Sequence, residues 1–323
     1  MSYFFALSNE LAFFKRIYQI MEQKIIAVVV TFNRLTLLKR AIEFIQKQTL
    51  SVCEIIIVNN GSTDGTTEWL ASQESLTVVN QDNVGGAGGF YTGIKVAYEH
   101  DADWIWCMDD DVYPSEKCLE TLYSYSQRYS NIGIICPRRI QAGEVVYGET
   151  LKFNLSNPFR PLNRFLKSKD IGKHELVKIE GMAFEGPLVS RAVVDAIGFP
   201  NKDLFIFFDD SDYSYRATLA GFDVMYCKNA ILNKELFPMK ILKSGEYRNN
   251  WKLFYDIRNS TFFCSKYGKN SIFRFWGEYW RLSKIFLAMG LSFLLMRKKY
   301  QTCEFHKAVL AIKQGRKCQL GKI

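Results

Sequence analysis

The sequence is poor in the residues on which thiol and histidine chemistry depend. None of its eight cysteines stands at C-x-x-C spacing, and most lie in apolar runs. We therefore expect reduced core thiols, as in cytoplasmic proteins, and neither a zinc site nor a disulfide framework. Only three histidines occur, and none lies at the end of a predicted strand, which excludes a histidine-based catalytic triad. The Walker and dinucleotide-binding fingerprints are also missing.

The sequence also lacks a long hydrophobic run. The longest, Ile285–Met296, has twelve residues, whereas a helix that spans a bilayer needs about 20. Glu10 and the pair Lys15-Arg16 interrupt the aromatic N-terminus, and no small-residue cleavage site follows, so we expect no signal peptide. A chain that is 48% hydrophobic and 23% charged is too apolar for a disordered protein. These features predict a folded cytoplasmic protein with residues 1–23 as an N-terminal extension.

Positive charge is concentrated near the C-terminus. The 323 residues carry a net charge of +9, and residues 264–323 alone hold thirteen lysines and arginines against two acids. The apolar run 285–296 lies in this region next to Trp276, Tyr279 and Trp280, with basic residues on both sides. This pattern favours a helix in the interface of an anionic membrane, although a helix packed on the rest of the protein would look the same. A nucleic-acid-binding tail would need a docking fold or stacking platforms, and neither is visible.

Apolar runs of strand length alternate with stretches of helical periodicity between residues 24 and 250. Strands are predicted at residues 24–31, 54–59, 76–79, 104–108, 132–136, 204–208 and 222–227. The alternation predicts an α/β fold with a mostly parallel central sheet flanked by helices, followed by a helical, basic region at 251–323. Residues 141–180 have weaker periodicity and are expected to form a mobile excursion.

Ligands of such sheets bind beyond the carboxyl ends of the strands. Polar clusters fall at these ends, at residues 31–34, 59–62, 83–86 and 109–111. The last cluster consists of three acids that directly follow WIWCM. Residues i and i+2 of an extended segment point to the same side, so Asp109 and Asp111 can converge on one Mg²⁺ or Mn²⁺ ion. The alternative is a solvated acidic turn or a helix cap.

A second acidic pair, Asp209-Asp210, follows another apolar run. One of these carboxylates could act as a general base that takes a proton from an attacking hydroxyl. Because a helix is predicted directly behind them, both could instead be caps. The glycine-rich segment 83–90 (NVGGAGGF) suggests a close approach of backbone to a ligand, but glycines that serve packing alone would look the same.

Five motifs occur in order and together resemble the inverting family 2 glycosyltransferases with the GT-A fold. They read VVVTFNRLTLLKRAI, IIIVNNGSTDGT, NVGGAGGF, WIWCMDDD and LFIFFDDSDYSYR, and they cover roughly residues 24–260. The combination of NVGGAGGF with DDD and FFDD is most similar to bacterial galactofuranosyltransferases. Residues 255–259 (YDIRN) resemble a motif of rhamnosyltransferases in the same superfamily.

The resemblance implies an inverting hexosyltransferase. The cysteine usage and the basic aromatic tail predict that it is cytoplasmic and peripheral on the inner face of the cell membrane. Its donor would be UDP-galactofuranose, its acceptor a hydroxyl of a lipid-linked glycan in cell-surface polysaccharide biosynthesis, and its cofactor Mn²⁺ or Mg²⁺. Nucleic acid is not an expected partner. The alternatives are a rhamnosyltransferase that uses dTDP-rhamnose and a non-catalytic protein that binds a nucleotide sugar or a membrane.

The resemblance also implies roles for single residues. Asp109 and Asp111 would hold the metal and the diphosphate, Asp210 would deprotonate the acceptor hydroxyl, and Asp209 would help to position the acceptor. The nucleotide sugar would lie against Thr31, Arg34, Asn60, Asn83, Asp109 and Asp110, with Asn60 near the uracil.

The chain departs from the family pattern at two places. Asn59-Asn60 occupies a loop in which the family often has an aspartate, which removes a charge near the base. Asn233 stands in the stretch where the family commonly has a histidine as third metal ligand. If Asn233 replaces that histidine, metal affinity should fall.

Overall fold

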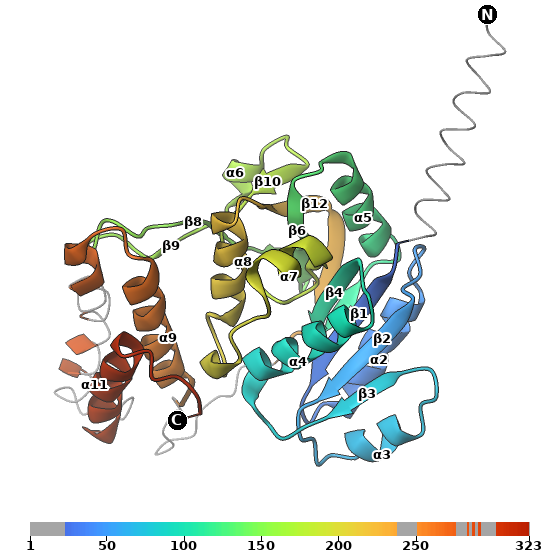
Figure 1. The fold of residues 1–323 in the computed structure, drawn as a ribbon, viewed down its shortest axis with the longest axis horizontal. Helices are drawn as coiled ribbons and strands as arrows, with labels where there is room; N and C mark the ends of the chain where they lie inside the picture. Colours follow the sequence, from blue (N-terminus) through green and yellow to red (C-terminus); the bar gives the residue numbers. More distant parts are fainter. Residues whose placement is uncertain are drawn as a thin grey trace, which may run out of the picture.

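The computed structural model describes residues 23–237, 251–275, 283, 286–287, 290–291 and 302–322. The predicted N-terminal extension up to residue 22, and most of the aromatic and apolar segment 276–296, lie outside these residues. Figure 1 shows a large sheet with helices on both faces, and two helices near the C-terminus that lie beside it.

A mostly parallel sheet forms the centre of the molecule. In the described residues it consists of β1 (Ile25–Thr31), β2 (Glu54–Asn59), β3 (Thr77–Asn80), β4 (Trp104–Asp109), β5 (Val112–Pro114), β6 (Ile132–Gln141), β7 (Glu144–Val146), β10 (Leu176–Lys178), β11 (Leu188–Ser190) and β12 (Asp223–Lys234). The strand order is β10-β12-β6-β11-β4-β1-β2-β3, with β5 paired to β12 and β7 to β6.

The central strands run in parallel. β1 pairs in parallel with both β2 and β4, β2 pairs in parallel with β3, and β6 pairs in parallel with β12. In contrast, β11 runs antiparallel between β4 and β6. The predicted α/β fold is confirmed.

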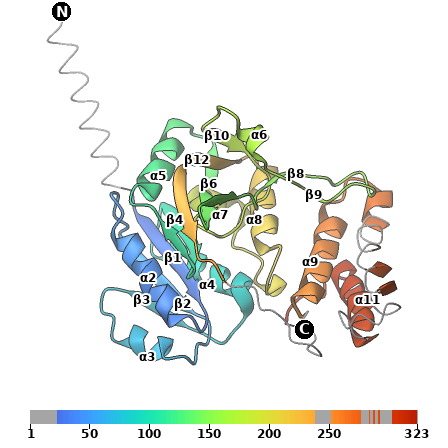
Figure 2. The same ribbon diagram turned by 180° about the vertical axis from the view of Figure 1, so that it is seen from behind.

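Helices cover both faces of this sheet (Figure 2). They are α2 (Leu35–Gln46), α3 (Thr66–Ala71), α4 (Gly85–Glu99), α5 (Cys118–Arg128), α7 (Arg191–Ile197) and α8 (Asp209–Leu219). Alternate residues of β1 pack into two cores: Ile26 and Val28 into the core shared with α4, α7 and α8, and Ala27 and Val29 into the core shared with α2 and α5. Burial on both faces explains why the β1 run contains no polar residue before its last position.

Residues 141–180 form regular structure, so the expectation of a mobile excursion is wrong. The region contains β7, the hairpin of β8 (Thr150–Phe153) and β9 (Asn163–Phe165), the short helix α6 (Ser168–Ile171) and β10. Leu166, Ile171 and Ile179 pack into the main core. The apolar residues that anchor this region are widely spaced in the sequence, so they leave no periodic signal.

The segment predicted as a strand at 204–208 is not a strand. It begins in the 3₁₀ helix η1 (Lys202–Leu204) and continues as an irregular loop into α8. The helix α4 begins at Gly85, within the glycine-rich segment, and Pro114 ends β5, four residues before α5 begins at Cys118. Phenylalanine runs satisfy a strand pattern, but here tertiary contacts decide the backbone.

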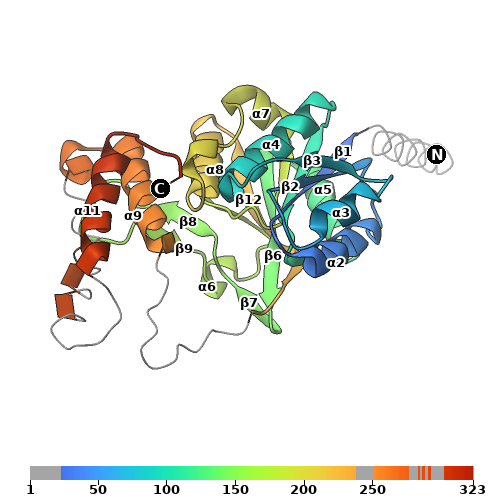
Figure 3. The same ribbon diagram turned by 90° about the horizontal axis from the view of Figure 1, so that it is seen from below.

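The C-terminal helix α9 (Trp251–Tyr267) lies beside α8, and α11 (Thr302–Arg316) packs on the far side of α9 (Figure 3). They share a small core in which Phe254 and Ile257 of α9 meet Ala308 and Ile312 of α11. No helix in the described part of the chain is long and apolar enough to cross a membrane.

Candidate active site

The acids 109–111 lie where β4 leaves the sheet, next to the end of β1. Thr31 Oγ1 donates a hydrogen bond to Asp110 Oδ2 at 2.7 Å. One guanidinium nitrogen of Arg34 lies 3.0 Å from Asp110 Oδ1 and 3.1 Å from Asp111 Oδ2. The Arg34 side chain is 42% exposed, so it remains open to an anionic ligand. The structure thus brings together the residues that the sequence places at the ends of two different strands.

The negative charges of the three aspartates are not fully balanced by Arg34. Burial, followed by repulsion from Asp111, Glu185 and Asp110, raises the pKa of Asp109 well above its usual range. The buried Oδ1 of Asp111 has no hydrogen-bond partner. A divalent cation would satisfy both groups, and carboxylate oxygens suit Mg²⁺ or Mn²⁺. Within the described residues no group of three metal-ligating side chains forms, so water and a diphosphate would complete the coordination.

The end of β12 brings a lysine to this cluster. Lys234 Nζ donates a hydrogen bond to Glu185. Burial opposes ionisation of Lys234, but Glu185 and the cluster aspartates outweigh it and raise its pKa. Side chains alternate along a strand, so Asn233 points to the other side, where its Nδ2 lies 3.5 Å from the carbonyl oxygen of Tyr113. Asn233 therefore does not face the cluster as a third metal ligand would.

A buried ion-pair network extends from Lys234 into the protein. Glu185 accepts hydrogen bonds from both Lys234 and Arg139, and Arg139 Nε donates to Glu149 Oε1 at 3.1 Å. Burial opposes ionisation of Glu185, but Arg139 and Lys234 outweigh it and hold its pKa below the usual range. Sequence reasoning missed all four residues. The one available signal was a lone charge in an apolar run, as for Glu185 in FEGPLVS.

Asp209 and Asp210 are the first two residues of α8. Asp209 is buried, whereas Asp210 is half-buried and accepts a hydrogen bond from the Ser211 amide at 2.6 Å. Burial raises the pKa of both carboxyls, and repulsion from Asp210 adds to the shift of Asp209. The charge of Glu185 also raises the pKa of Asp210, while Arg139 lowers it. A carboxylate with a raised pKa is the stronger base.

The polar residues that follow β2 and β3 bond mainly to one another. Asn60 is buried; its Nδ2 donates to the Gly85 carbonyl at 2.9 Å, and its Oδ1 accepts from Gln81 at 3.0 Å. Asn83 Oδ1 accepts from the Gly85 amide at 3.0 Å. These bonds fix the turn that starts α4. The contacts of Asn60 with uracil and of Asn83 with the donor stay predictions.

The glycine-rich segment was expected to let backbone approach a ligand, but its tightest contact is with the backbone of another loop of this protein. Gly85 has a φ of +78°, and a Cβ there would lie 2.0 Å from the carbonyl oxygen of Phe205. That oxygen accepts a hydrogen bond from the Ala87 amide at 3.1 Å. The start of α4 is thus packed on the loop that leads to Asp209. In contrast, nothing lies within 4 Å of a Cβ built on Gly86.

The family model described as "Glycosyl transferase family 2" matches residues 26–184. These residues are a family 2 glycosyltransferase domain. The domain contains the ends of β1 and β4 with their acids, and it stops directly before Glu185. Asp209, Asp210 and α9 lie beyond it.

Relatives of this glycosyltransferase cover most of the chain. It is 26% identical over 300 residues to the galactofuranosyltransferase GlfT1 of Mycobacterium tuberculosis, with 86% of this chain and 91% of that protein aligned. It is 27% identical over 298 residues to GlfT1 of Mycolicibacterium smegmatis, which covers 84% and 90%. It is also 25% identical over 215 residues to the O-antigen chain rhamnosyltransferase RfbN of Salmonella typhimurium, which covers 65% of each.

The fold of the glycosyltransferase resembles the crystal structure of TarS from S. aureus. The TM-score is 0.52 at 14% identity, and the match covers 76% of this chain and 39% of that chain. The mostly parallel sheet flanked by helices is therefore the expected GT-A fold. The roles of the site residues stay predictions.

Proposed function

We propose that this glycosyltransferase moves galactofuranose from UDP-galactofuranose, with inversion, onto a hydroxyl of a lipid-linked glycan in cell-surface polysaccharide biosynthesis. One observation carries the proposal: two galactofuranosyltransferases align with more than four-fifths of the chain. The chain has acids at both places that such a transfer would use, at the end of β4 and at the start of α8. A charged donor and a neutral acceptor hydroxyl would each meet one of these two acidic centres.

The first centre is suited to the donor. Arg34 and Lys234 bring positive charge to the β4 acids, and both can stabilise the negative charge that develops on a departing diphosphate. Asp109 and Asp111 would hold a divalent ion, which acts as a Lewis acid on that diphosphate. Asp110 is already bonded to Thr31 and Arg34, so its role is to fix Arg34 for the donor.

The second centre is suited to the acceptor. Asp210 is only half-buried, so an acceptor hydroxyl can reach it, and its raised pKa favours proton uptake. The hydroxyl oxygen, once deprotonated, attacks the anomeric carbon as the bond to the diphosphate breaks. A single in-line displacement of this kind inverts the anomeric centre. Asp209, which is buried next to Asp210, would help to position the acceptor.

The sugar assignment is supported by relatives. Two galactofuranosyltransferases align with more than four-fifths of the chain, and this supports UDP-galactofuranose. The rhamnosyltransferase RfbN aligns with 65% of it, which supports dTDP-rhamnose as the second candidate. A non-catalytic protein that binds a nucleotide sugar or a membrane is the remaining alternative, and the donor screen below separates it from an enzyme.

A donor screen tests this assignment. The full chain with Mn²⁺ is offered UDP-galactofuranose, UDP-galactopyranose, UDP-glucose and dTDP-rhamnose, and the released nucleoside diphosphate is measured. We expect release from UDP-galactofuranose alone. Release from dTDP-rhamnose alone would transfer the assignment to rhamnose, and no release from any donor would contradict an enzyme.

A lipid-linked acceptor requires access to the membrane, and we propose that residues 251–323 provide it on anionic lipid. Large apolar side chains are exposed on the described parts of this region: Trp251, Ile272, Phe275, Leu287, Leu291, Val309 and Leu310. Basic residues near an anionic surface each contribute about 1 kcal/mol. Sedimentation with anionic vesicles at low salt, but with neither neutral vesicles nor anionic vesicles at high salt, is expected; equal binding to both lipids would reject an electrostatic anchor.

A further inference from the structure

The loop between η1 and α8 has a backbone that phenylalanine rarely adopts. Phe205, Phe207 and Phe208 each have a φ of +66°, in the left-handed region that side chains with a Cβ disfavour. Such residues persist only where their surroundings enforce the conformation. Asp209 and Asp210 follow directly, so this loop decides from where α8 presents both carboxylates.

One side chain of α9 holds most of this loop. Asn259 is fully buried, and its Nδ2 lies 2.9 Å from the carbonyl oxygen of Leu204, 2.8 Å from that of Ile206 and 3.0 Å from that of Phe207. A side-chain amide has two N–H donors, so three carbonyl groups share them. The Leu204 carbonyl also accepts from the Ile206 amide at 2.8 Å, so the contribution of Asn259 is largest at the Ile206 and Phe207 carbonyls, which a buried amide keeps paired.

The preceding residue of α9 fixes this amide. Arg258 Nε donates to Asn259 Oδ1 at 2.8 Å, which leaves the NH₂ group facing the loop. A second guanidinium nitrogen donates to the Leu204 carbonyl at 3.1 Å, and the third to the Gly321 carbonyl. Arg258 is fully buried, and no carboxylate of the described residues pairs with it. Its guanidinium group instead donates to backbone carbonyl groups. This indicates that Arg258 positions the backbone of the loop.

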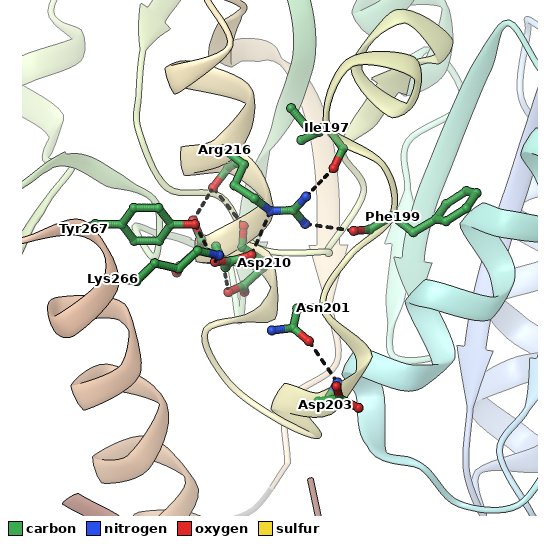
Figure 4. Close-up of polar contacts among 11 residues, drawn as sticks. Ile197, Phe199, Asn201, Asp203, Asp210, Arg216, Lys266 and Tyr267 are labelled. Atoms are coloured by element: carbon green, nitrogen blue, oxygen red, sulfur yellow. Dashed lines mark hydrogen bonds and ion pairs between the residues drawn. The ribbon is translucent and has the colours of Figure 1, made fainter. Parts of the chain in front are cut away.

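Two further contacts connect α9 with the loop and with α8. The ring of Tyr255 stacks on that of Phe205, with centroids 5.0 Å apart. Asp212, fully buried in the first turns of α8, accepts hydrogen bonds from Lys266 Nζ at 3.1 Å and from Tyr267 Oη at 2.7 Å. Figure 4 shows Lys266 and Tyr267 reaching from α9 toward α8, close to Asp210.

We infer that Arg258 and Asn259 are positioning residues for the acceptor-side carboxylates: they lock the strained loop so that α8 presents Asp210 in one place. The inference rests on the proposed role of Asp210 as base. It gives a physical reason for the motif Tyr255–Asn259, in which Tyr255, Arg258 and Asn259 all contact the loop or its neighbour η1.

The test compares Asn259→Ala with Ser260→Ala. Ser260 is the next residue of α9, and among the described residues its hydroxyl bonds to the Ile257 carbonyl of the same helix alone, so it is a matched control. We expect Asn259→Ala to lower kcat for UDP release from UDP-galactofuranose at least tenfold, with the Kd for UDP changed less than twofold. Hydrogen exchange in residues 204–212, measured without substrate, should become at least tenfold faster. Ser260→Ala should change neither quantity.

A milder variant covers the case in which Asn259→Ala does not fold. Arg258→Lys keeps the charge but removes the bond that orients Asn259, and it should accelerate exchange in 204–212 and lower kcat by roughly threefold to tenfold. Unchanged exchange and unchanged kcat in the folded variants would overturn the inference. Faster exchange in Asn259→Ala together with full turnover in Asp210→Asn would instead place the error in the proposed function, because exchange reports on the loop whichever residue is the base.

Discussion

The two acidic centres of this glycosyltransferase are positioned by different means. The β4 acids stand at the end of a strand and directly after it; this strand pairs in parallel with β1 up to Asp109, and antiparallel with β11 over residues 104–106. Backbone ladders therefore fix their place. Asp209 and Asp210 follow a loop with three left-handed phenylalanines, and side chains of α9, about 50 residues later in the chain, hold that loop. Donor-side geometry is a property of the sheet, whereas acceptor-side geometry depends on a distant helix.

This difference predicts where the site tolerates change. A ladder of backbone bonds survives most side-chain substitutions, so the donor side should fail only when a side chain that holds the donor or contacts the β4 acids changes. The acceptor side should fail when any of several supporting residues changes.

The largest effect is expected for Asp210→Asn. An amide of the same size cannot take up the proton, and general-base catalysis contributes typically 10²–10⁴-fold, so turnover should fall within that range. UDP binding should change little, because the loss falls on the transition state. The measurements are single-turnover rates and calorimetric UDP titration. A rate above about half that of the natural protein would move the base to Asp209 or Asp212.

A somewhat smaller loss is expected for Asp111→Asn, which probes the donor side. Metal ions contribute several kcal/mol of charge stabilisation, so turnover should fall on the order of 10²–10³-fold, with little change in thermal unfolding. Glu74→Gln, an exposed acid remote from the site, is the control. Full activity of Asp111→Asn at limiting Mn²⁺ would contradict a metal at the β4 acids.

Gly85→Ala breaks the contact between the two regions. The added Cβ would meet the Phe205 carbonyl at 2.0 Å, and the φ of +78° disfavours alanine. We expect a loss of about 1–3 kcal/mol in the free energy of unfolding, measured by urea denaturation. Gly86→Ala, with nothing within 4 Å, should be neutral or stabilising in the same experiment. Equal unfolding of both variants would show that the loop does not depend on α4.

The smallest effect is expected for Asp209→Asn, which tests the buried acceptor-side acid. Its pKa is raised in the folded state, so the folded protein binds more protons than the unfolded chain above pH 4. Stability is therefore lost as pH rises toward the raised pKa. Asp209→Asn should raise Tm by about 2–4 °C at pH 8 and leave it nearly unchanged below pH 4. The same shift at both pH values would attribute the effect to packing.

The sequence allowed the sheet to be predicted, because uninterrupted apolar runs of strand length are typical of buried parallel strands. It also placed the β4 acids at the end of a strand, although their role as a metal site stays a prediction. It also placed Thr31 and Arg34 at the same edge, and the structure joins both to Asp110. The strand prediction for residues 204–208 failed because the pattern of this run does not fix its backbone. Its phenylalanines pack separately on α4 and α9, and the contacts that impose the loop come from residues far away in the chain.

The ion-pair network could not be predicted for a related reason. Arg139, Glu149, Glu185 and Lys234 come from four separate segments, and nothing in the local sequence says that they converge. The position of Asn233 shows the limit of motif alignment. One residue of register decides which side chain of a strand faces the site, and here Lys234 does.

The contact of Arg258 with Gly321 has a practical consequence for handling the protein. The Gly321 carbonyl accepts from Arg258, and its amide donates to the Asp203 carbonyl at 2.6 Å, so the residues that follow α11 fold back against the base of the acceptor loop. A purification tag fused behind Ile323 would begin two residues from this contact and could compete with it. Affinity tags for kinetic work therefore belong ahead of β1, which begins at Ile25, at the opposite end of the strand from Thr31.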